Sequence, residues 1–260
     1  MKKFVALLLA VLMVASLCAC GQKGTGSDLQ TVTKGKLIMS TNAEFAPYEY
    51  VADDGKGFQG TGYEGIDIEI AYALAQKLGL ELVVDNMDFD AALSAVQTGK
   101  SDMVAAGVTV TPDRLNAMSF TDSYANGVQV VIVKEGSDIK SIDDLQGKKI
   151  GTQRGTTGFL YCSDDFGDDN VIGFDDGATA VQNLKAGKID CVVIDNVPAQ
   201  EYVKANPGLT ILDTEYANED YAIGIAKDNT ALQEALNKAL AELKADGTIQ
   251  SIIDKYISAK

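Results

Sequence analysis

The chain contains two arginines, Arg114 and Arg154, so few groups can hold a carboxylate in a bidentate fork. Arg114 follows an apolar segment, residues 103–109, that we predict to be a strand. Open α/β sheets bind their ligands beyond the carboxyl ends of their strands. A single arginine is most often a solvated surface charge, but this position favours Arg114 as the group that binds an anion.

Two further features lie at predicted strand ends. Gly155-Thr156-Thr157-Gly158 joins a strand to a helix N-terminus, where free N–H groups attract anions, although many helices simply begin with a threonine cap. Asp195 ends an apolar strand and is either a negative charge for a ligand or another helix cap. With Arg114, these groups offer sites for both a negative and a positive charge.

Composition excludes several classes of site. The 260-residue chain has no histidine, so neither a Ser-His-Asp or Cys-His catalytic arrangement nor a histidine-ligated metal site can form. We expect no metal and no cofactor. With 22 basic and 37 acidic residues, the chain is a poor partner for nucleic acid, which needs clustered Lys and Arg. Because unperturbed Asp and Arg do not titrate near neutrality, we expect ligand binding to be nearly independent of pH between about 6 and 8.

The N-terminal residues resemble a bacterial lipoprotein signal. After a basic start, the apolar run at residues 4–17 is too short to span a membrane and is typical of a secretory signal. It ends in Leu17-Cys18-Ala19-Cys20, which resembles a lipobox with Cys20 as the lipidated residue. We predict a signal peptide at residues 1–19, palmitate or a similar lipid on Cys20, and a flexible tether at residues 20–33. A cleaved signal without lipid is the alternative.

Apolar spacing predicts two similar α/β units, each with a parallel sheet. Ala-Val-Gln followed by Gly-Lys-x-Asp-x-Val occurs at residues 95–104 and again, with three more residues between, at 180–192. Strands are expected at residues 36–40, 80–84, 103–109, 149–153, 171–174 and 191–195, and helices at 66–78, 91–98, from 155, at 178–185, 231–245 and 248–257.

Two extended segments, residues 124–133 and 221–226, connect these units, so the chain enters the second unit and returns. Two connections make a hinge whose main motion is opening and closing. The predicted boundaries are a discontinuous lobe 1 at residues 34–126 and 220–260 and a lobe 2 at residues 127–219. Cys162 and Cys191 both lie in lobe 2, where they either form a disulfide or remain two buried thiols.

Four motifs, in order, resemble the bacterial extracellular solute-binding proteins of the polar amino-acid group. They are Gly-Ile-Asp-Ile-Glu-Ile-Ala at residues 65–71, Ala-Gly-Val-Thr-Val-Thr-Pro-Asp-Arg at 106–114, Gly-Thr-Thr-Gly at 155–158 and Ile-Asp-Cys-Val-Val-Ile-Asp at 189–195. The resemblance covers residues 36–258. Members of this family are receptors of ABC importers. The resemblance implies an α/β protein with two Rossmann-like lobes, a two-strand hinge and a ligand cleft between the lobes, the type 2 periplasmic-binding-protein fold.

The resemblance also implies partners and a location. The ligand is a polar or basic L-amino acid, the partner is an ABC transporter permease, and the protein is a lipid-anchored monomer on the outer face of the cell membrane. Two other readings remain open. One is an amino-acid sensor that signals through another chain. The other is a dehydratase-like enzyme on the same fold, but no acid–base constellation accompanies the binding motifs. We therefore expect no enzyme and no catalytic residue.

Roles for individual residues follow from the same resemblance. Arg114 is implied to bind the ligand carboxylate, helped by backbone groups of lobe 1 and by Thr156 and Thr157 of lobe 2, while Asp195 binds the ammonium. Asn42 occupies a place where relatives that bind basic amino acids often carry Asp, and Glu44 could supply the missing charge. Phenylalanines form the pocket walls. The full predicted set is Asn42, Phe45, Phe89, Ala106, Gly107, Thr109, Arg114, Gln153, Thr156, Thr157 and Asp195.

Overall fold

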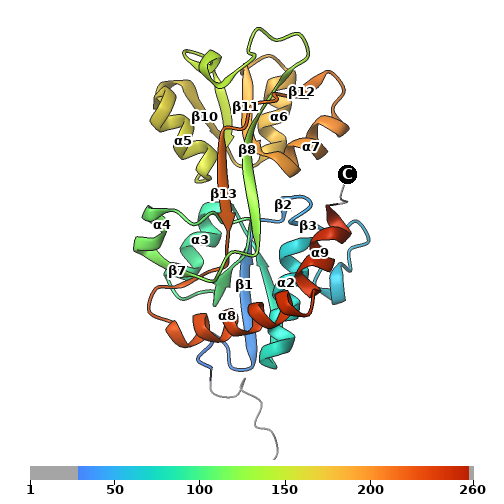
Figure 1. Ribbon diagram of the computed structural model, residues 1–260, viewed down its shortest axis with the longest axis vertical. Helices are drawn as coiled ribbons and strands as arrows, with labels where there is room; N and C mark the ends of the chain where they lie inside the picture. The colour runs from blue at the N-terminus through green and yellow to red at the C-terminus, as the bar shows by residue number, and fades with distance from the viewer. Residues whose placement is uncertain (1–28, 258–260) are drawn as a thin grey trace, which may run out of the picture.

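The computed structural model describes residues 29–257 and shows two lobes arranged along the long axis of the molecule (Figure 1). Each lobe has its own β-sheet, and separate apolar clusters pack on the two faces of each sheet. The predicted signal peptide, Cys20 and most of the predicted tether lie outside the described residues. Within residues 29–257, no helix combines the length and the apolar character that crossing a membrane requires.

The sheet of lobe 1 has the strand order β5-β1-β6-β14-β7. β1, β5 and β6 are parallel, as predicted, and β14 adds an antiparallel neighbour. The strand predicted at residues 103–109 is shorter than expected, because β6 ends at Val104 and the chain turns away through Gly107 at a φ of 53°. The strand bounds are β1 Lys36–Thr41, β5 Glu81–Asn86, β6 Met103–Val104, β7 Met118–Phe120 and β14 Gly224–Ala226.

Helices cover both faces of this sheet. α2 follows the predicted four-residue apolar spacing and ends at Gly79, whose φ of 69° is the left-handed conformation that glycine adopts readily. A small three-stranded sheet packs beside α2. The bounds are α2 Ile66–Leu78, α3 Phe89–Gln97, α4 Pro112–Ala117, α8 Thr230–Ala245, α9 Thr248–Tyr256, β2 Glu44–Phe45, β3 Glu49–Val51 and β4 Tyr63–Glu64.

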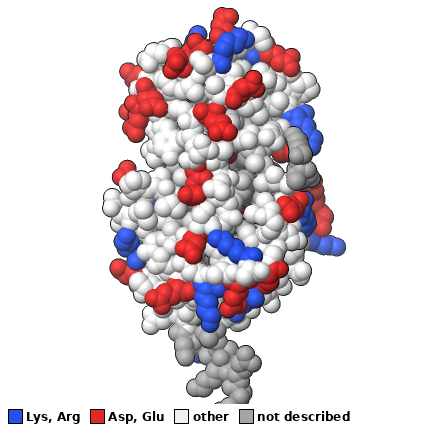
Figure 2. Space-filling model, in the orientation of Figure 1, with Lys and Arg blue, Asp and Glu red and all other residues white. Residues whose placement is uncertain are grey.

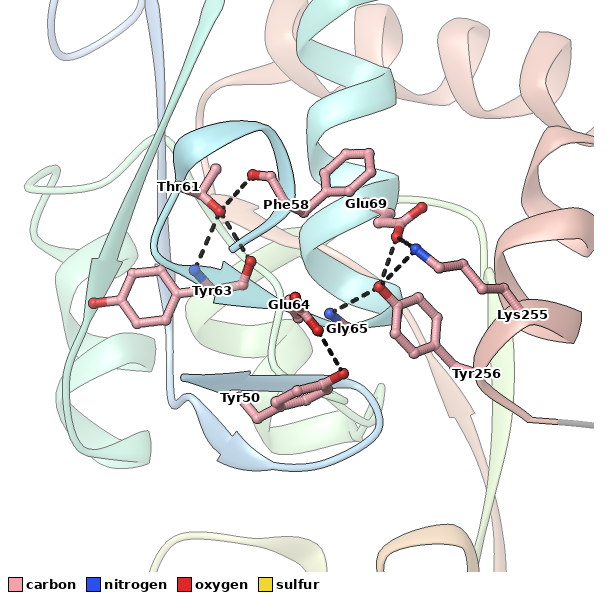
Figure 3. A network of polar contacts seen from close by, with 9 residues as sticks. All are labelled: Tyr50, Phe58, Thr61, Tyr63, Glu64, Gly65, Glu69, Lys255 and Tyr256. Carbon is pink, nitrogen blue, oxygen red and sulfur yellow. Dashed lines mark hydrogen bonds and ion pairs between the residues drawn. The ribbon is translucent and has the colours of Figure 1, made fainter. Parts of the chain in front are cut away.

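A polar network fixes the first turn of α2 (Figure 3). Glu69 accepts hydrogen bonds from the Tyr256 hydroxyl at 2.6 Å and from the Lys255 ammonium, both on α9. The backbone N–H of Gly65 donates to the Tyr256 oxygen at 3.4 Å. The C-terminal helix therefore holds the segment that carries Asp67, whose role in the pocket is described below.

The sheet of lobe 2 has the order β10-β9-β11-β8-β12, with β13 also paired to β8. β9, β10 and β11 are parallel and β8 is antiparallel to β11, so only three neighbouring strands, which begin at one edge of each sheet, match the parallel prediction. Helix α7 is a further element that the spacing did not predict. The bounds are β8 Ala125–Lys134, β9 Ile150–Gln153, α5 Thr157–Phe166, β10 Val171–Phe174, α6 Gly177–Lys185, β11 Cys191–Asp195, α7 Asn196–Ala205, β12 Leu209–Ile211 and β13 Ala217–Tyr221.

The repeated sequence motif has the same structural role in both lobes. The Asp102 carboxylate accepts from the N–H of Ile38 at 2.7 Å, and the N–H of Asp102 donates back to the Ile38 carbonyl at 2.9 Å. Asp190 makes the same two-way contact with Lys149, at 2.8 Å and 2.9 Å. Each aspartate thus clamps its own strand to the neighbouring parallel strand.

Two antiparallel strands, β8 and β13, run between the lobes (Figure 1). Their register pairs Ala125 with Tyr221 and Gln129 with Ala217. Both predicted lobe boundaries, after residues 126 and 219, fall within these strands. The extended segment predicted at residues 221–226 is divided between the end of β13 and β14.

Cys162 and Cys191 are free thiols with no exposed surface, and both belong to one apolar cluster of lobe 2. Burial raises the pKa of the Cys162 thiol to about 12 and that of Cys191 further. Protonated, buried thiols are unreactive, so the structure favours the second of the two alternatives, a pair of small core residues.

Candidate functional site

A pocket with an empty volume of about 460 Å³ is lined by residues of both lobes. All eleven predicted site residues line it, although the sequence distributes them between positions 42 and 195. Four further lining residues were not predicted: Glu49, Gln129, Val193 and Ile194.

Arg114 lies in this pocket, only 8% exposed. Its backbone N–H donates to the Thr111 hydroxyl that caps α4, which orients the start of this short helix. Nη1 donates to the Thr109 carbonyl at 2.8 Å and Nη2 to the Gly155 carbonyl of lobe 2 at 3.0 Å. Burial lowers the pKa of Arg114, but a guanidinium stays charged, and its remaining N–H groups are available to a carboxylate.

The second arginine has a different environment. The Arg154 side chain is 51% exposed and forms an ion pair with Asp175, which is also exposed. It does not belong to the pocket lining. The solvated-charge interpretation therefore applies to Arg154, and the anion-binding interpretation to Arg114.

Asp195 stands at the N-cap position of α7 but makes no capping hydrogen bond with its side chain. The carboxylate instead lies buried in the pocket and accepts from the Tyr221 hydroxyl. Burial, with nearby Glu219, raises the pKa of Asp195 well above its ordinary value. The assumption of an unperturbed carboxyl, on which the expected pH independence rests, is therefore wrong in this structure.

The N-terminus of α5 faces the same pocket. Thr156 caps it, since its hydroxyl accepts from the N–H of Phe159 at 3.4 Å and donates to the Gln153 carbonyl at 2.8 Å. The Thr156 hydroxyl is thus used by the helix, and the first N–H groups of α5 remain the anion-binding groups that lobe 2 offers. Thr157 is the first residue of the helix and is buried.

Two amide side chains of the pocket lining meet across the two lobes. Gln153 Nε2 donates to Asn42 Oδ1 at 2.9 Å across the two lobes, and to the Asp175 carbonyl at 3.1 Å. Asn42 Nδ2 donates to the Met87 carbonyl at 3.1 Å. Glu44 is exposed and does not line the pocket, although burial and the charges of Asp176 and Asp88 raise its pKa. It does not replace the charge missing at position 42.

The unpredicted lining residues have different origins. Val193 and Ile194 belong to the same apolar strand as Asp195, so the sequence could have indicated them as neighbours. Gln129 lies on β8, where its Nε2 donates to Glu219 on β13 at 2.9 Å. Glu49 lies on β3, paired with Phe45 of β2, outside every strand and helix that the sequence predicted.

The model of one protein family, the bacterial extracellular solute-binding proteins, family 3, matches residues 37–259. The chain belongs to this family. The arginine-binding extracellular protein ArtP of Bacillus subtilis (strain 168) is 33% identical over 270 residues, which cover all of both chains. The family 3 relationship confirms that this is an extracytoplasmic solute-binding protein of the kind that serves ABC transporters, as the motifs indicated.

Solved structures of family 3 proteins share the two-lobe fold. An ancestral arginine-binding protein bound to arginine is 41% identical, with a TM-score of 0.78 over 86% of this chain and 99% of that one. An ancestral arginine-binding protein bound to glutamine is 40% identical, with a TM-score of 0.80 over 87% of this chain and 100% of that one. The type 2 periplasmic-binding-protein fold is confirmed.

Proposed function

We propose that this family 3 protein captures a basic L-amino acid, with L-arginine as the preferred ligand, and presents it to an ABC permease. The observation that carries the proposal is the placement of Arg114 and Asp195 in one buried pocket that both lobes form. These residues supply a cation for a carboxylate and an anion for an ammonium. The proposal includes a binding role without catalysis.

The charge of the pocket supports a basic ligand. Among its fifteen lining residues one is basic, Arg114, and two are acidic, Glu49 and Asp195. A zwitterion with a cationic side chain balances this set better than a neutral one. Phe45 and Phe89 line the pocket together with Asn42 and Gln153, and their rings would flank an aliphatic stem or contact a guanidinium. The arginine-binding relatives named above are consistent with this ligand.

Closure of the lobes is part of the proposal. Hydrogen bonds already join the lobes at Arg114 to Gly155, at Gln153 to Asn42 and at the Tyr202 hydroxyl to the Glu44 carbonyl. β8 and β13 are the segments that would bend. A ligand that contacts both lobes favours the closed state, because only there does it form all its hydrogen bonds.

The location and assembly remain predictions. We propose that a lipid on Cys20 holds the protein, as a monomer, at the outer face of the membrane. Figure 2 shows acidic side chains spread over the visible face, in agreement with the formal charge of −15. The intact mass of protein extracted from the membrane tests the anchor, because Cys20→Ser should remove the added lipid mass.

A thermal-shift panel of the common amino acids tests the ligand. At 100 times its Kd a ligand adds about 2.7 kcal/mol of stability, so L-arginine should give the largest rise in Tm. A larger rise with glutamine or another neutral amino acid would reassign the specificity, and no rise with any amino acid would overturn the function. Mass spectrometry of the recovered L-arginine should show it unchanged, whereas a converted product would favour an enzyme.

Gly155→Ala should weaken L-arginine binding about tenfold, or about 1.4 kcal/mol, without removing any polar group from the pocket. Gly155 has a φ of 73°, and a Cβ there would overlap the Asp90 carboxylate of the other lobe, so the Asp90 side chain must rotate away before the lobes close. Gly147→Ala is the matched control, since Gly147 has a φ of 72° but open space around it. Calorimetric titration of both variants checks this, and equal losses of affinity would show that backbone strain, not closure, is responsible.

A further inference from the structure

Two carboxyl groups to which the proposed function assigns no contact with the ligand lie buried together beside the pocket. Glu49, on β3, and Asp67, in the first turn of α2, are each 1% exposed. Glu49 lines the pocket, as does Asp195, whose charge also acts on Glu49. Three acidic side chains thus converge on one side of the ligand site.

The hydrogen bonds of this group are incomplete without an additional proton. Asp67 Oδ2 accepts from the N–H of Gly107 at 2.9 Å and from the Tyr124 hydroxyl at 2.7 Å. Among the described residues, no donor reaches Asp67 Oδ1 or either oxygen of Glu49. Burial raises the pKa of Glu49, and Asp67 lies close enough for its charge to raise that pKa further. Two buried carboxyl groups in this arrangement, with three oxygens that no donor in residues 29–257 reaches, are best satisfied when one of them carries a proton.

The surroundings assign this proton to Glu49. Two donors stabilise the ionised form of Asp67, so Asp67 is the better acceptor and Glu49 the better donor. The other titratable groups around the pair are hydroxyls, Tyr48 and Tyr124, and the acid Asp195 with its Tyr221 partner. Within residues 29–257, neither Glu49 nor Asp67 forms an ion pair with Lys or Arg. A proton is therefore the positive charge that the empty pocket holds there.

We propose that the ligand ammonium replaces this shared proton, so that binding of the amino acid releases a proton from the Glu49–Asp67 pair. The idea rests on the proposed function, because it needs a cationic group to enter beside Asp195. Glu49 faces the pocket, so an incoming ammonium adds a positive charge and new N–H donors next to the pair. Both effects favour the ionised form of Glu49. The released proton passes to the solvent buffer.

The direction of the pH dependence follows from linkage. Burial raises the pKa of Glu49 well above its ordinary range and that of Asp67 to about 6, so the empty pair holds a proton more tightly than free carboxyl groups do. A ligand that binds the deprotonated form more tightly binds better as pH rises. Release of one proton per ligand corresponds to an affinity that falls about tenfold for each unit of decreasing pH. Asp67 also orients the pocket lining, because its carboxylate accepts a hydrogen bond from the N–H of the lining residue Gly107.

Calorimetric titration with L-arginine at pH 7, in two buffers of different ionisation enthalpy, tests the exchange. The guanidinium and ammonium of the ligand stay protonated at this pH, so a difference between the two measured enthalpies reports protons released by the protein. We expect release of about one proton per ligand. No binding heat in either buffer would refute the proposed function itself. Binding with equal enthalpies in both buffers would leave that function intact and overturn the proton exchange.

Glu49→Gln locates the proton. Glutamine keeps a donor for Asp67 and a carbonyl oxygen for the pocket but cannot release a proton, so the release of this proton should disappear and the affinity should vary less between pH 6 and 8 than in the unaltered protein. Glu81→Gln is the control, since the Glu81 side chain is 67% exposed and far from the pocket lining. Unchanged proton release in Glu49→Gln would assign it to another group, such as Asp195, and overturn the proposal. Should this variant fail to fold, the two-buffer titration of the unaltered protein decides alone.

Discussion

Arg114→Ala is expected to weaken L-arginine binding by about 100-fold or more, which corresponds to roughly 3 kcal/mol. The guanidinium is buried, and its fork is the main positive charge that the pocket presents to the ligand carboxylate. Without it the carboxylate would be buried beside the α5 N-terminus alone. The same side chain joins the lobes through the Gly155 carbonyl, so closure is weakened as well. Calorimetric titration measures the loss.

Arg154→Ala is the matched control for this variant. It removes the same group from an exposed site outside the pocket lining, where ion pairs contribute about 0–1 kcal/mol. Its affinity for L-arginine should equal that of the unaltered protein within about twofold. Equal losses in the two variants would indicate a general effect of charge, and an unchanged affinity in Arg114→Ala would remove Arg114 from the site.

Asp195→Asn is expected to move affinity and stability in opposite directions. The amide keeps the shape but loses the charge that the ammonium requires, so L-arginine affinity should fall about 100-fold. The empty protein should become more stable at pH 7, by about 1 kcal/mol, because a buried carboxylate is no longer held in the pocket. Denaturant titration of the empty protein and calorimetry with L-arginine measure the two effects.

The pH dependence of the stability gain in Asp195→Asn distinguishes a loss of buried charge from simple repacking. The folded pKa of Asp195 is raised, so its ionisation costs stability as pH rises above its ordinary value of about 4. The extra stability of Asp195→Asn should therefore be present at pH 7 and vanish near pH 3.5, where Asp195 is largely protonated in both the folded and the unfolded protein. Asp213→Asn, at an exposed position, should show no such gain. A gain that is equal at both pH values would contradict a charge-based origin.

Most of the site was predictable because the binding groups follow strand ends. Each sheet gathers the carboxyl ends of its parallel strands at one edge, and both lobes contribute such groups to one pocket, so Arg114, the α5 N-terminus and Asp195 meet although they are far apart in sequence. For Asp195 and Thr156, the choice between a helix cap and a ligand-binding group could be made only from the structure. Asp195 occupies a cap position without capping, and Thr156, which was expected to help hold the ligand carboxylate, uses its hydroxyl to cap α5.

The acidic pair beside the pocket could not be predicted in this way. Glu49 belongs to a short strand of a small sheet whose glycine-rich sequence shows no strand pattern. Asp67 has the position of an ordinary acid in the first turn of a helix. Their coupling depends on burial, which no periodicity encodes. The same lack of burial information explains why the sequence predicted pH-independent binding, whereas the structure raises the pKa of each pocket carboxyl.

The proposed function depends on recognition of both main-chain charges of a free basic amino acid. Calorimetric titration with L-arginine, set against agmatine, which has the same guanidinium and amine but no carboxylate, tests this most directly. We expect saturable one-to-one binding of L-arginine and about 100-fold weaker binding of agmatine, because agmatine offers no carboxylate to Arg114 and the α5 N-terminus. Equal affinity for the two compounds, or no binding of L-arginine, would contradict it.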